Sequence, residues 1–330
     1  MELDELDYPL PDAAVAQRPA EPRDAARLLV DRGPGVAPAH LTVAAFPDLV
    51  GPGDVVVLND SRVRRARLRL RKATGGAVEA LLLTPAGDGS DEWEALLRPS
   101  RRVAVGIPLT TDDGTVTVEP VAALGDGRWR VRIEGDADAA GDVPLPPYIH
   151  EPLADPDRYQ TVYARRPVAA AAPTAGLHLT HDVLARCRQR GATLATIELA
   201  IGLDTFRPVT EARVEDHPMH REAYIVPEAT MSACEGATRV VAIGTTVVRA
   251  LEAAAATGAL EGRTDLFITR GYRFRVVDAL LTNFHVPRTT LIALVDAFVG
   301  PRWRALYDVA LSSGYRFLSF GDAMFVERGP

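Results

Sequence analysis

The strongest constraint on the fold is a run of short, alternating segments between Ala66 and about Glu134. Apolar and polar residues alternate in "ARLRLRK", "AVEALLLTP", "EWEALLRP", "TVTVEPVAAL" and "RWRVRIEG", and turn signals such as GG, AGDGSD and GDG separate these segments. Alternation with a period of two is typical of β-strands that bury one face. Because no helical segment falls between the strands, we expect a small antiparallel β-barrel.

The sequence after Pro146 has a helical period instead. The segment "LTHDVLARCRQRG" predicts a helix with Thr180 as its N-cap and Gly191 just past its end. The segment "RVVAIGTTVVRALEAAAATG" predicts a buried strand from Arg239 to Ile243, a Gly-Thr-Thr turn, and a helix that ends at Gly258. A further helix is expected in "TTLIALVDAFVG", and a closing hairpin or strand pair in "GYRFLSFGDAMFV".

These patterns together predict a mixed α/β fold class with a discontinuous main domain. The strand "GDVVVLND" before the alternating segments is expected to join the α/β region that follows them. We therefore expect a main α/β domain over residues 1–62 and 147–330, interrupted by an inserted antiparallel β-barrel over residues 63–146.

Charge is concentrated in one short stretch of an otherwise acidic chain. The formal net charge is -7, and residues 62–72 carry seven Arg or Lys and no acid, which leaves -14 on the remainder. A general nucleic-acid coat is disfavoured, but a confined positive groove is compatible with this distribution. Within the stretch, Arg67, Arg69 and Arg71 alternate with apolar residues, so they form either a phosphate-binding row or a charged edge that prevents strand pairing.

The sequence shows no pattern typical of secretion, membrane insertion or metal binding. The two cysteines, Cys187 and Cys234, form no close pair, and the acidic N-terminal sequence is unlike a signal peptide. No run of about 18 apolar residues exists that would span a bilayer. His217 and His220 lie three residues apart without a third ligand at motif spacing. We expect a cytoplasmic protein with no membrane association and no metal, and we favour a monomer.

Three segments carry polar residues in places where chemistry is plausible. In "AAPTAGLHLTHDVL", His178 and backbone N–H groups precede a helix, which suits either an anionic group or a plain turn and cap. In "AIGTTVVRALE", Thr245, Thr246 and Arg249 follow a buried strand, as in a phosphate or ribose site or in an ordinary capped connection. No glycine-rich nucleotide fingerprint is present, so a P-loop nucleotidase and a dinucleotide dehydrogenase are disfavoured.

The third segment, "VVDALLTNFHVPRTTL", sets polar groups among apolar residues. Asp278, Asn283 and His285 require hydrogen-bond partners there, which are either backbone groups or a bound purine or ribose.

Taken together, the segments resemble the S-adenosylmethionine:tRNA ribosyltransferase-isomerase family of queuosine biosynthesis. The resemblance runs in order from "LDYPLPDAAVAQRPAEPRDAARLLV" through "GDVVVLNDSRVRRARL", "LPPYI", "DRYQTVYA", "APTAGLHLT", "TFRPV", "HPMHREAY" and "RVVAIGTTVVRALE" to "LLTNFHVPRTTL" and "GYRFLSFGDAM". It covers nearly the whole chain, and the inserted β-module is the least similar part. The family is known for a discontinuous α/β domain interrupted by a small β-barrel.

The resemblance implies a specific reaction. The ribosyl part of S-adenosylmethionine would be transferred to 7-aminomethyl-7-deazaguanine at the wobble position of tRNA and isomerised to an epoxycyclopentanediol, with loss of adenine and methionine. S-adenosylmethionine would be consumed as the donor, no metal is implied, and the tRNA anticodon stem-loop would be the macromolecular partner.

The resemblance also implies roles for individual residues. His178 and Asp278 are the candidates for base and acid, in either order. The candidate substrate-binding residues are Asn59, Asp60, Arg62, Thr174, Gly176, Thr245, Thr246, Arg249, Asn283 and His285. The candidate tRNA-binding residues are Arg64, Arg65, Arg67, Arg69 and Arg71, which would hold anticodon-stem phosphates.

The chain departs from the family pattern at several positions near these motifs. Ala200 stands where the family has histidine, and Asp204 where it has glycine. Val168 and Ala169 replace a Gly-Ser pair, and Leu179 replaces a phenylalanine. These departures leave two alternatives open: a related enzyme with a small-molecule acceptor, and a non-catalytic protein that binds RNA through the β-module. A methyltransferase is disfavoured because an early glycine-rich strand-turn-helix is missing.

Overall fold

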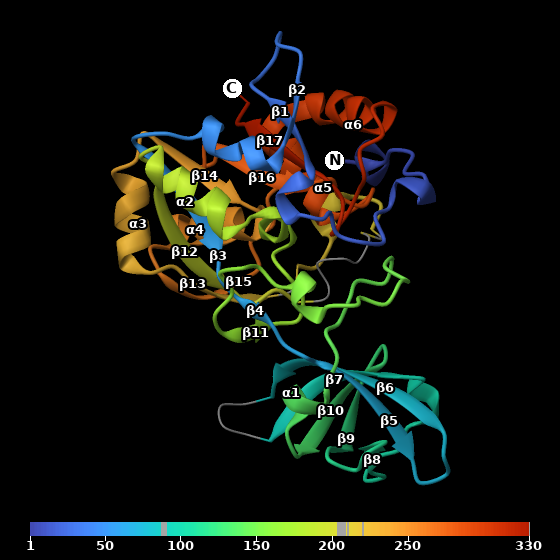
Figure 1. Ribbon diagram of the computed structural model, residues 1–330. Helices are drawn as coiled ribbons and strands as arrows, with labels where there is room; N and C mark the ends of the chain where they lie inside the picture. Colours follow the sequence, from blue (N-terminus) through green and yellow to red (C-terminus); the bar gives the residue numbers. More distant parts are fainter. Residues whose placement is uncertain (87–90, 203–208, 210, 220, 330) are drawn as a thin grey trace. The chain divides into compact units, whose positions relative to one another are not determined.

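The computed structural model describes residues 1–86, 91–202, 209, 211–219 and 221–329. The chain divides into two compact units, one formed by Met1–Arg62 with Pro146–Pro330 and the other by Val63–Leu145 (Figure 1). The larger unit combines helices with a large mixed sheet, and the smaller unit contains a closed antiparallel barrel. The predicted fold class is confirmed.

In the described residues, the larger unit contains a nine-stranded sheet in the order β15-β13-β12-β3-β14-β16-β17-β1-β2. Its strands are β1 (Arg27–Asp31), β2 (Ala39–Thr42), β3 (Asp54–Asn59), β12 (Thr193–Leu199), β13 (Glu222–Ile225), β14 (Arg239–Ile243), β15 (Glu261–Thr264), β16 (Ala279–Asn283) and β17 (Ala323–Glu327). The central strands β12, β3, β14 and β16 run parallel to one another. Parallel strands need crossover connections, and the helices of this unit supply several of them.

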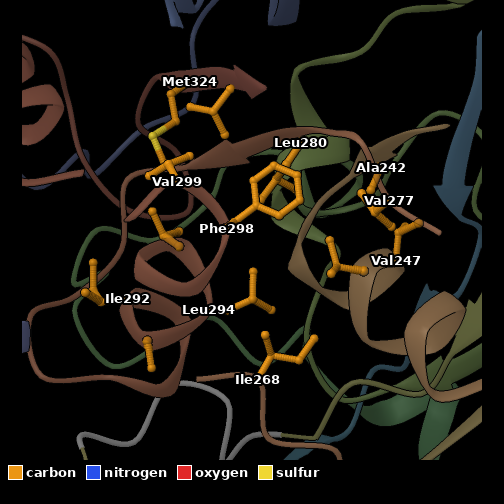
Figure 2. Close-up of a cluster of buried hydrophobic side chains, with 14 of the residues drawn as sticks. Ala242, Val247, Ile268, Val277, Leu280, Ile292, Leu294, Phe298, Val299 and Met324 are labelled. Atoms are coloured by element: carbon orange, nitrogen blue, oxygen red, sulfur yellow. The ribbon is translucent and has the colours of Figure 1, made fainter. Parts of the chain in front are cut away.

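Helices cover both faces of the sheet. They are α2 (His181–Gln189), α3 (Glu228–Glu235), α4 (Thr245–Thr257), α5 (Thr290–Val299) and α6 (Trp303–Ser312). One core cluster packs α3, α4, α5 and α6 against side chains such as Val55, Val57 and Leu280, and Figure 2 shows part of it. A second cluster packs α2 against Val56 and Leu58. The alternation along β3 therefore fills two cores, because successive side chains of a strand point to opposite faces.

The smaller unit is a closed barrel in the order β10-β7-β6-β5-β8-β9, followed by the short helix α1 (Ala137–Ala140). Its strands are β5 (Arg67–Lys72), β6 (Ala77–Pro85), β7 (Glu92–Arg98), β8 (Leu109–Thr111), β9 (Thr117–Gly125) and β10 (Arg128–Glu134). Ala66, Leu68 and Leu70 are buried in the barrel core. The predicted alternation is confirmed, because closure buries one face of each strand and leaves the other in solvent. A two-stranded sheet of β4 (Arg62–Val63) and β11 (Pro167–Ala169) completes the strands of the described residues.

Most predicted helix ends are confirmed, and one predicted strand pair is wrong. The Thr180 side chain accepts a hydrogen bond from the Val183 N–H at 3.1 Å, which caps α2 as expected. Gly258 has φ 73°, the left-handed conformation that ends α4. The segment "GYRFLSFGDAMFV" forms no hairpin, because its one strand, β17, pairs with β16 and β1 instead of with a strand of its own segment. Among the helices that the structure describes, none has the length and apolar character needed to cross a bilayer.

Candidate active site

The predicted binding residues gather where the central parallel strands end. Asn59 is the last residue of β3, Thr245 follows Gly244 at the end of β14, and Asn283 is the last residue of β16. These strands are parallel, so their carboxyl ends lie at one edge of the sheet. In open α/β sheets, ligands bind in the crevice outside this edge.

Two small cavities lie at this edge and share the walls Thr174, His285 and Leu291. The other residues that line the first cavity are Tyr148, Asn283, Phe284, Val286, Thr289, Leu318 and Ser319. The second is lined further by Ala172, Pro173, Ala175, Ile201, Gly244, Thr245, Thr246 and Thr282. Their volumes are about 20 Å³ and 30 Å³, so each has room for a water molecule but is too small for a nucleoside as it stands.

His178 is held by a residue of the cavity wall. It ends the 3-10 helix η7 (Thr174–His178), and its Nε2 lies 3.0 Å from Nδ2 of Asn283. The same Asn283 nitrogen donates a hydrogen bond to the carbonyl oxygen of Leu318 at 3.1 Å. Sequence separation of 105 residues hides this contact from any local pattern.

The surroundings of His178 oppose a positive charge on its ring. Burial, together with the guanidinium groups of Arg316, Arg23 and Arg158, lowers the pKa of His178 to about 4. Burial alone lowers the pKa of His285 to about 3. Both imidazoles are therefore neutral at neutral pH.

His285 is fixed by the polar network behind the cavities. Its Nε2 lies 2.9 Å from the hydroxyl of Thr282, and its backbone N–H donates to the hydroxyl of Tyr307 at 3.0 Å. The hydroxyl of Tyr8 donates in turn to the His285 carbonyl oxygen. The ring position is therefore set by both main-chain and side-chain bonds.

Tyr148 and Ser319 also belong to the cavity wall, although the sequence does not single them out as site residues. Their hydroxyl oxygens lie 2.7 Å apart. Tyr148 belongs to the "LPPYI" motif and Ser319 to "GYRFLSFGDAM", so both stand in segments that carry the family resemblance. Their position within those motifs is the sequence signal from which they could have been predicted as site residues.

Asn59 and Asp60 of the "NDSRV" motif differ in their surroundings. The Asn59 carboxamide donates to the Leu199 carbonyl oxygen at 3.1 Å and accepts from the backbone N–H groups of Leu199 and Ser61. It therefore connects β3 to β12 and caps its own turn. Asp60 is buried, and burial raises the pKa of its carboxyl group despite Arg165, which lies 3.6 Å away. Arg62 is half-exposed and lies 3.4 Å from Asp157.

Arg249 forms a buried ion pair with Glu222. Glu222 also accepts the backbone N–H of Gly202 at 2.8 Å, and Arg249 Nε donates to the Leu266 carbonyl oxygen at 3.3 Å. The pair thus connects α4 to β13 and to the segment after β12. Breaking such a pair leaves an uncompensated buried charge, so both residues have a structural role whatever they bind.

Asp278 does not lie near His178, contrary to the expectation that the two form a catalytic pair. Asp278 precedes β16, whereas Asn283, the partner of His178, ends that strand. Five residues of strand span roughly 17 Å. The Asp278 carboxylate accepts the backbone N–H of Val240 at 2.9 Å and pairs with Arg328 at 3.2 Å. It therefore joins strand starts at the opposite edge of the sheet, and the structure does not bring Asp278 and His178 together as a pair.

Gly176 is required by packing. A Cβ atom at this position would lie 2.0 Å from the Tyr163 hydroxyl oxygen and 3.0 Å from Cγ2 of Thr161. Only glycine lets η7 approach Tyr163 this closely. Ala175 of the same turn lies close to Gly244, so the turn also packs against the end of β14.

The arginine row on the barrel is matched by carboxylates. Arg64 pairs with Asp138 at 3.0 Å and Arg69 with Asp142 at 3.0 Å. Arg67 lies 3.8 Å from Glu79, and Arg71 pairs with Asp112. Arg65 is exposed, and the described residues provide it with no ion pair. The row therefore carries much less free charge than the sequence suggests.

The positions that depart from the family pattern have ordinary structural surroundings where they are described. Ala200 donates its N–H to the Ala223 carbonyl oxygen at 2.9 Å, and Ala169 and Leu179 are fully buried. Val168 belongs to β11. Asp204 lies outside the described residues.

One of the two histidines considered as metal ligands, His217, pairs with a carboxylate. His217 Nδ1 lies 2.8 Å from a carboxylate oxygen of Glu211, and His220 lies outside the described residues. Within the part of the chain that the structure describes, no three His, Cys, Asp or Glu residues are placed to share a metal ion.

The fold and the geometry of the strand ends define the chain as an α/β protein with two small, adjoining cavities at the carboxyl edge of its parallel strands. The chain belongs to the queuosine biosynthesis protein family, whose model matches residues 3–326. It is 52% identical to the S-adenosylmethionine:tRNA ribosyltransferase-isomerase of Rubrobacter xylanophilus, over 100% of this chain and 98% of the relative. It is 48% identical to the protein of the same name from Thermus thermophilus, over 98% of this chain and 99% of the relative.

A solved structure is also similar. The crystal structure of S-adenosylmethionine tRNA ribosyltransferase from Thermotoga maritima matches with a TM-score of 0.56 at 32% sequence identity. The match covers 98% of this chain and 99% of that one. Similarity therefore extends across both compact units.

Proposed function

We propose that the chain is an S-adenosylmethionine:tRNA ribosyltransferase-isomerase. It transfers the ribosyl moiety of S-adenosylmethionine to 7-aminomethyl-7-deazaguanine at the tRNA wobble position and isomerises it, giving epoxyqueuosine and releasing adenine and methionine. The observation that carries this proposal is that Thr174, Thr245, Thr246, Asn283 and His285, from three separate motifs, line two adjoining cavities. Full-length similarity to proteins of this name supports it.

The cavity walls suit a nucleoside with several hydroxyl and amino groups. Thr245 and Thr246 begin α4, where the free N–H groups of a helix start add to their hydroxyls. Asn283 and His285 supply donors and acceptors that are already desolvated. Apolar residues such as Ile201 and Leu291 complete the walls. This mixture of a few fixed polar groups with apolar surface is typical of small-molecule sites.

His178 is the proposed catalytic residue; it lines neither cavity but contacts Asn283, which lines the first one. It is neutral at neutral pH, so it accepts a proton or donates a hydrogen bond, and it does not act as an imidazolium acid. Asp278 has no part in the proposal because it lies at the opposite edge of the sheet.

The arginine row of the barrel is proposed to contact tRNA phosphates. The side chains of Arg69 and Asp142 are 82% and 55% exposed, and exposed ion pairs contribute only about 0–1 kcal/mol. A phosphate can therefore displace the carboxylate at little cost. Arg65 is exposed and needs no such exchange.

The test is a reaction of the purified protein with S-adenosylmethionine and tRNA that carries 7-aminomethyl-7-deazaguanine, followed by chromatography and mass spectrometry. We expect free adenine, free methionine and a mass-shifted wobble base. His178→Ala is expected to lower the rate at which all three are formed by roughly 100-fold. The matched control is His181→Ala, which removes an exposed histidine three residues away.

Other outcomes would reject the proposal. Adenine release without a modified tRNA would indicate a related enzyme with another acceptor, which the alanine at position 200 keeps open. Binding of tRNA and S-adenosylmethionine with no product would indicate a non-catalytic RNA-binding protein.

A further inference from the structure

We infer that Asn283 fixes His178 as the neutral tautomer with its proton on Nδ1, so that His178 serves the reaction as a hydrogen-bond donor and not as a base. The part of this inference that concerns substrate rests on the proposed function. The part that concerns the tautomer rests on geometry alone. Asn283 is then a positioning residue, since it acts through His178.

The orientation of the Asn283 carboxamide is determined by Leu318. The Leu318 carbonyl oxygen can only accept, and the Asn283 side-chain atom 3.1 Å away must therefore be the NH2 group. Rotating the amide by 180° would place two oxygen atoms against each other. It would also remove the donor that now faces His178.

Leu318 is itself held in an uncommon conformation that aims this carbonyl. Its φ is +70°, in the left-handed region that residues with a Cβ rarely adopt. The residue is buried, and its N–H donates to the Phe284 carbonyl oxygen at 3.0 Å. Strained backbone of this kind persists where the surrounding structure holds it, and it clusters at functional sites.

The tautomer of His178 follows from the amide orientation. The Asn283 NH2 group lies 3.0 Å from His178 Nε2, so Nε2 must offer its lone pair. A neutral imidazole carries one proton, which is then on Nδ1. The charged ring would place an N–H against an NH2 group. Burial and, to a smaller extent, the positive charges of Arg316, Arg23 and Arg158 also disfavour protonation of the ring.

The hydrogen bond from Asn283 occupies the ring nitrogen of His178 that a general base would need. Because the Nε2 lone pair accepts from Asn283, His178 is a poor proton acceptor. Its Nδ1–H is instead a neutral donor, suited to a substrate atom that gains negative charge, such as a nitrogen of departing adenine or an oxygen of the ribose. Neutral imidazole donors serve other enzymes in this way.

The side-chain oxygen of Asn283 is available to a ligand. Its Oδ1 is buried and finds no hydrogen-bond partner among the described residues, while the residue lines the first cavity. A buried acceptor without a partner is costly, so a ligand that brings an N–H or O–H there is favoured. An adenine amino group and a ribose hydroxyl both meet this requirement. Asn283 would thus contact the nucleoside and orient His178 at once.

The tautomer can be measured without assuming any activity. We would label the histidine rings of the full chain with ¹⁵N and record their nitrogen chemical shifts from pH 5 to pH 8. His178→Gln assigns the resonance by its disappearance. We expect a protonated Nδ1 and an unprotonated Nε2 throughout this range. A protonated Nε2, or an imidazolium at pH 6 or above, would overturn the inference.

Substitution of Asn283 tests its positioning role. In Asn283→Asp the carboxylate cannot donate, so Nε2 is expected to become protonated and the ¹⁵N pattern to reverse. An Asn283→Asp protein that folds and keeps the wild-type pattern would refute the role of Asn283. If Asn283→Asp does not fold, Asn283→Ser is the second variant: it removes the carboxamide without adding a charge, and a wild-type ¹⁵N pattern kept by this variant would refute the role of Asn283.

The donor role has a kinetic test. His178→Asn places an amide N–H near the position of Nδ1–H, whereas His178→Ala places no donor there. If His178 is a donor, His178→Ala should lower kcat by roughly 100-fold, and His178→Asn should recover at least part of that loss. If His178 is a base, both variants should lose activity equally. A confirmed tautomer in a protein that releases no adenine would leave the part of the inference that concerns the tautomer standing and reject the proposed function.

Discussion

Replacing Gly176 with alanine should destabilise the protein mainly through one clash, with the hydroxyl oxygen of Tyr163, and Tyr163→Phe should relieve most of it. The added Cβ would lie 2.0 Å from the Tyr163 hydroxyl oxygen but 3.1 Å from Cζ of the same ring. The hydroxyl is therefore the atom that forbids a side chain at position 176. No positive φ is involved at this glycine, so alanine is otherwise compatible with the backbone.

The magnitude can be worked from these contacts. Overpacking costs typically about 1–3 kcal/mol, whereas Gly→Ala at a compatible position contributes about 0.4–1 kcal/mol of stability. We therefore expect Gly176→Ala to lower the free energy of unfolding by about 2 kcal/mol. Tyr163→Phe alone should change stability by less than about 1 kcal/mol, because its buried hydroxyl has no partner in the described residues. In the double variant the cost of alanine should fall below about 1 kcal/mol.

The assay is a double-mutant cycle by equilibrium urea unfolding, with activity measured on the same four proteins. The control is Gly258→Ala, which has a positive φ and no atom within 4 Å of the added Cβ, so its cost should be the same in both backgrounds. An equal cost of Gly176→Ala with Tyr or Phe at position 163 would refute the clash. Lost activity in a double variant of restored stability would show that Gly176 also contacts substrate.

The remaining predictions concern charge. Asp142→Asn should strengthen tRNA binding and Arg69→Ala weaken it, each by a few-fold in a filter-binding titration at low salt, and the opposite order would reject the phosphate role of this pair. The free energy of unfolding should fall as the pH is lowered from 6.5 towards 4, because His178 and His285 take up protons in the unfolded chain but stay neutral when buried. Each histidine contributes about 1.4 kcal/mol per pH unit to this slope. His178→Gln should therefore remove about half of the slope in chemical denaturation. Glu252→Ala should cost about 3 kcal/mol, measured by urea unfolding, because the carboxylate accepts three backbone N–H groups of residues 275–277, and a loss below about 1 kcal/mol would show that water replaces it.

Local pattern was enough to predict the elements whose sequence period reflects one-sided burial. The alternation around Leu68 and Leu70 predicted the barrel strand, and the Thr180 cap predicted the start of α2. The turn at Gly244 and the left-handed end at Gly258 bounded α4 correctly. In each case the physical cause acts within a few residues of the signal.

The site was predictable only in part, since its contacts join distant segments. His178 and Asn283 were both candidates, but their hydrogen bond spans 105 residues and gives no local signal. Asp278 was grouped with His178 because the sequence does not show which end of β16 lies at the predicted site. The structure places Asp278 immediately before the start of β16, at the opposite edge of the sheet. The ion pair of Glu222 with Arg249 likewise depends on how β13 and α4 meet, which is set by the sheet order.

The carboxylates beside the arginine row act as counterions that the protein carries with it. A phosphate that reaches Arg69 or Arg71 exchanges one anion for another, so it gains only the difference between two contacts. Chance polyanions, which offer phosphates without a matching shape, are therefore held weakly on this face. If this row contacts tRNA as proposed, phosphates that meet several of these arginines at once gain that small difference at each contact, so discrimination would come from the spacing of the phosphates and not from total charge.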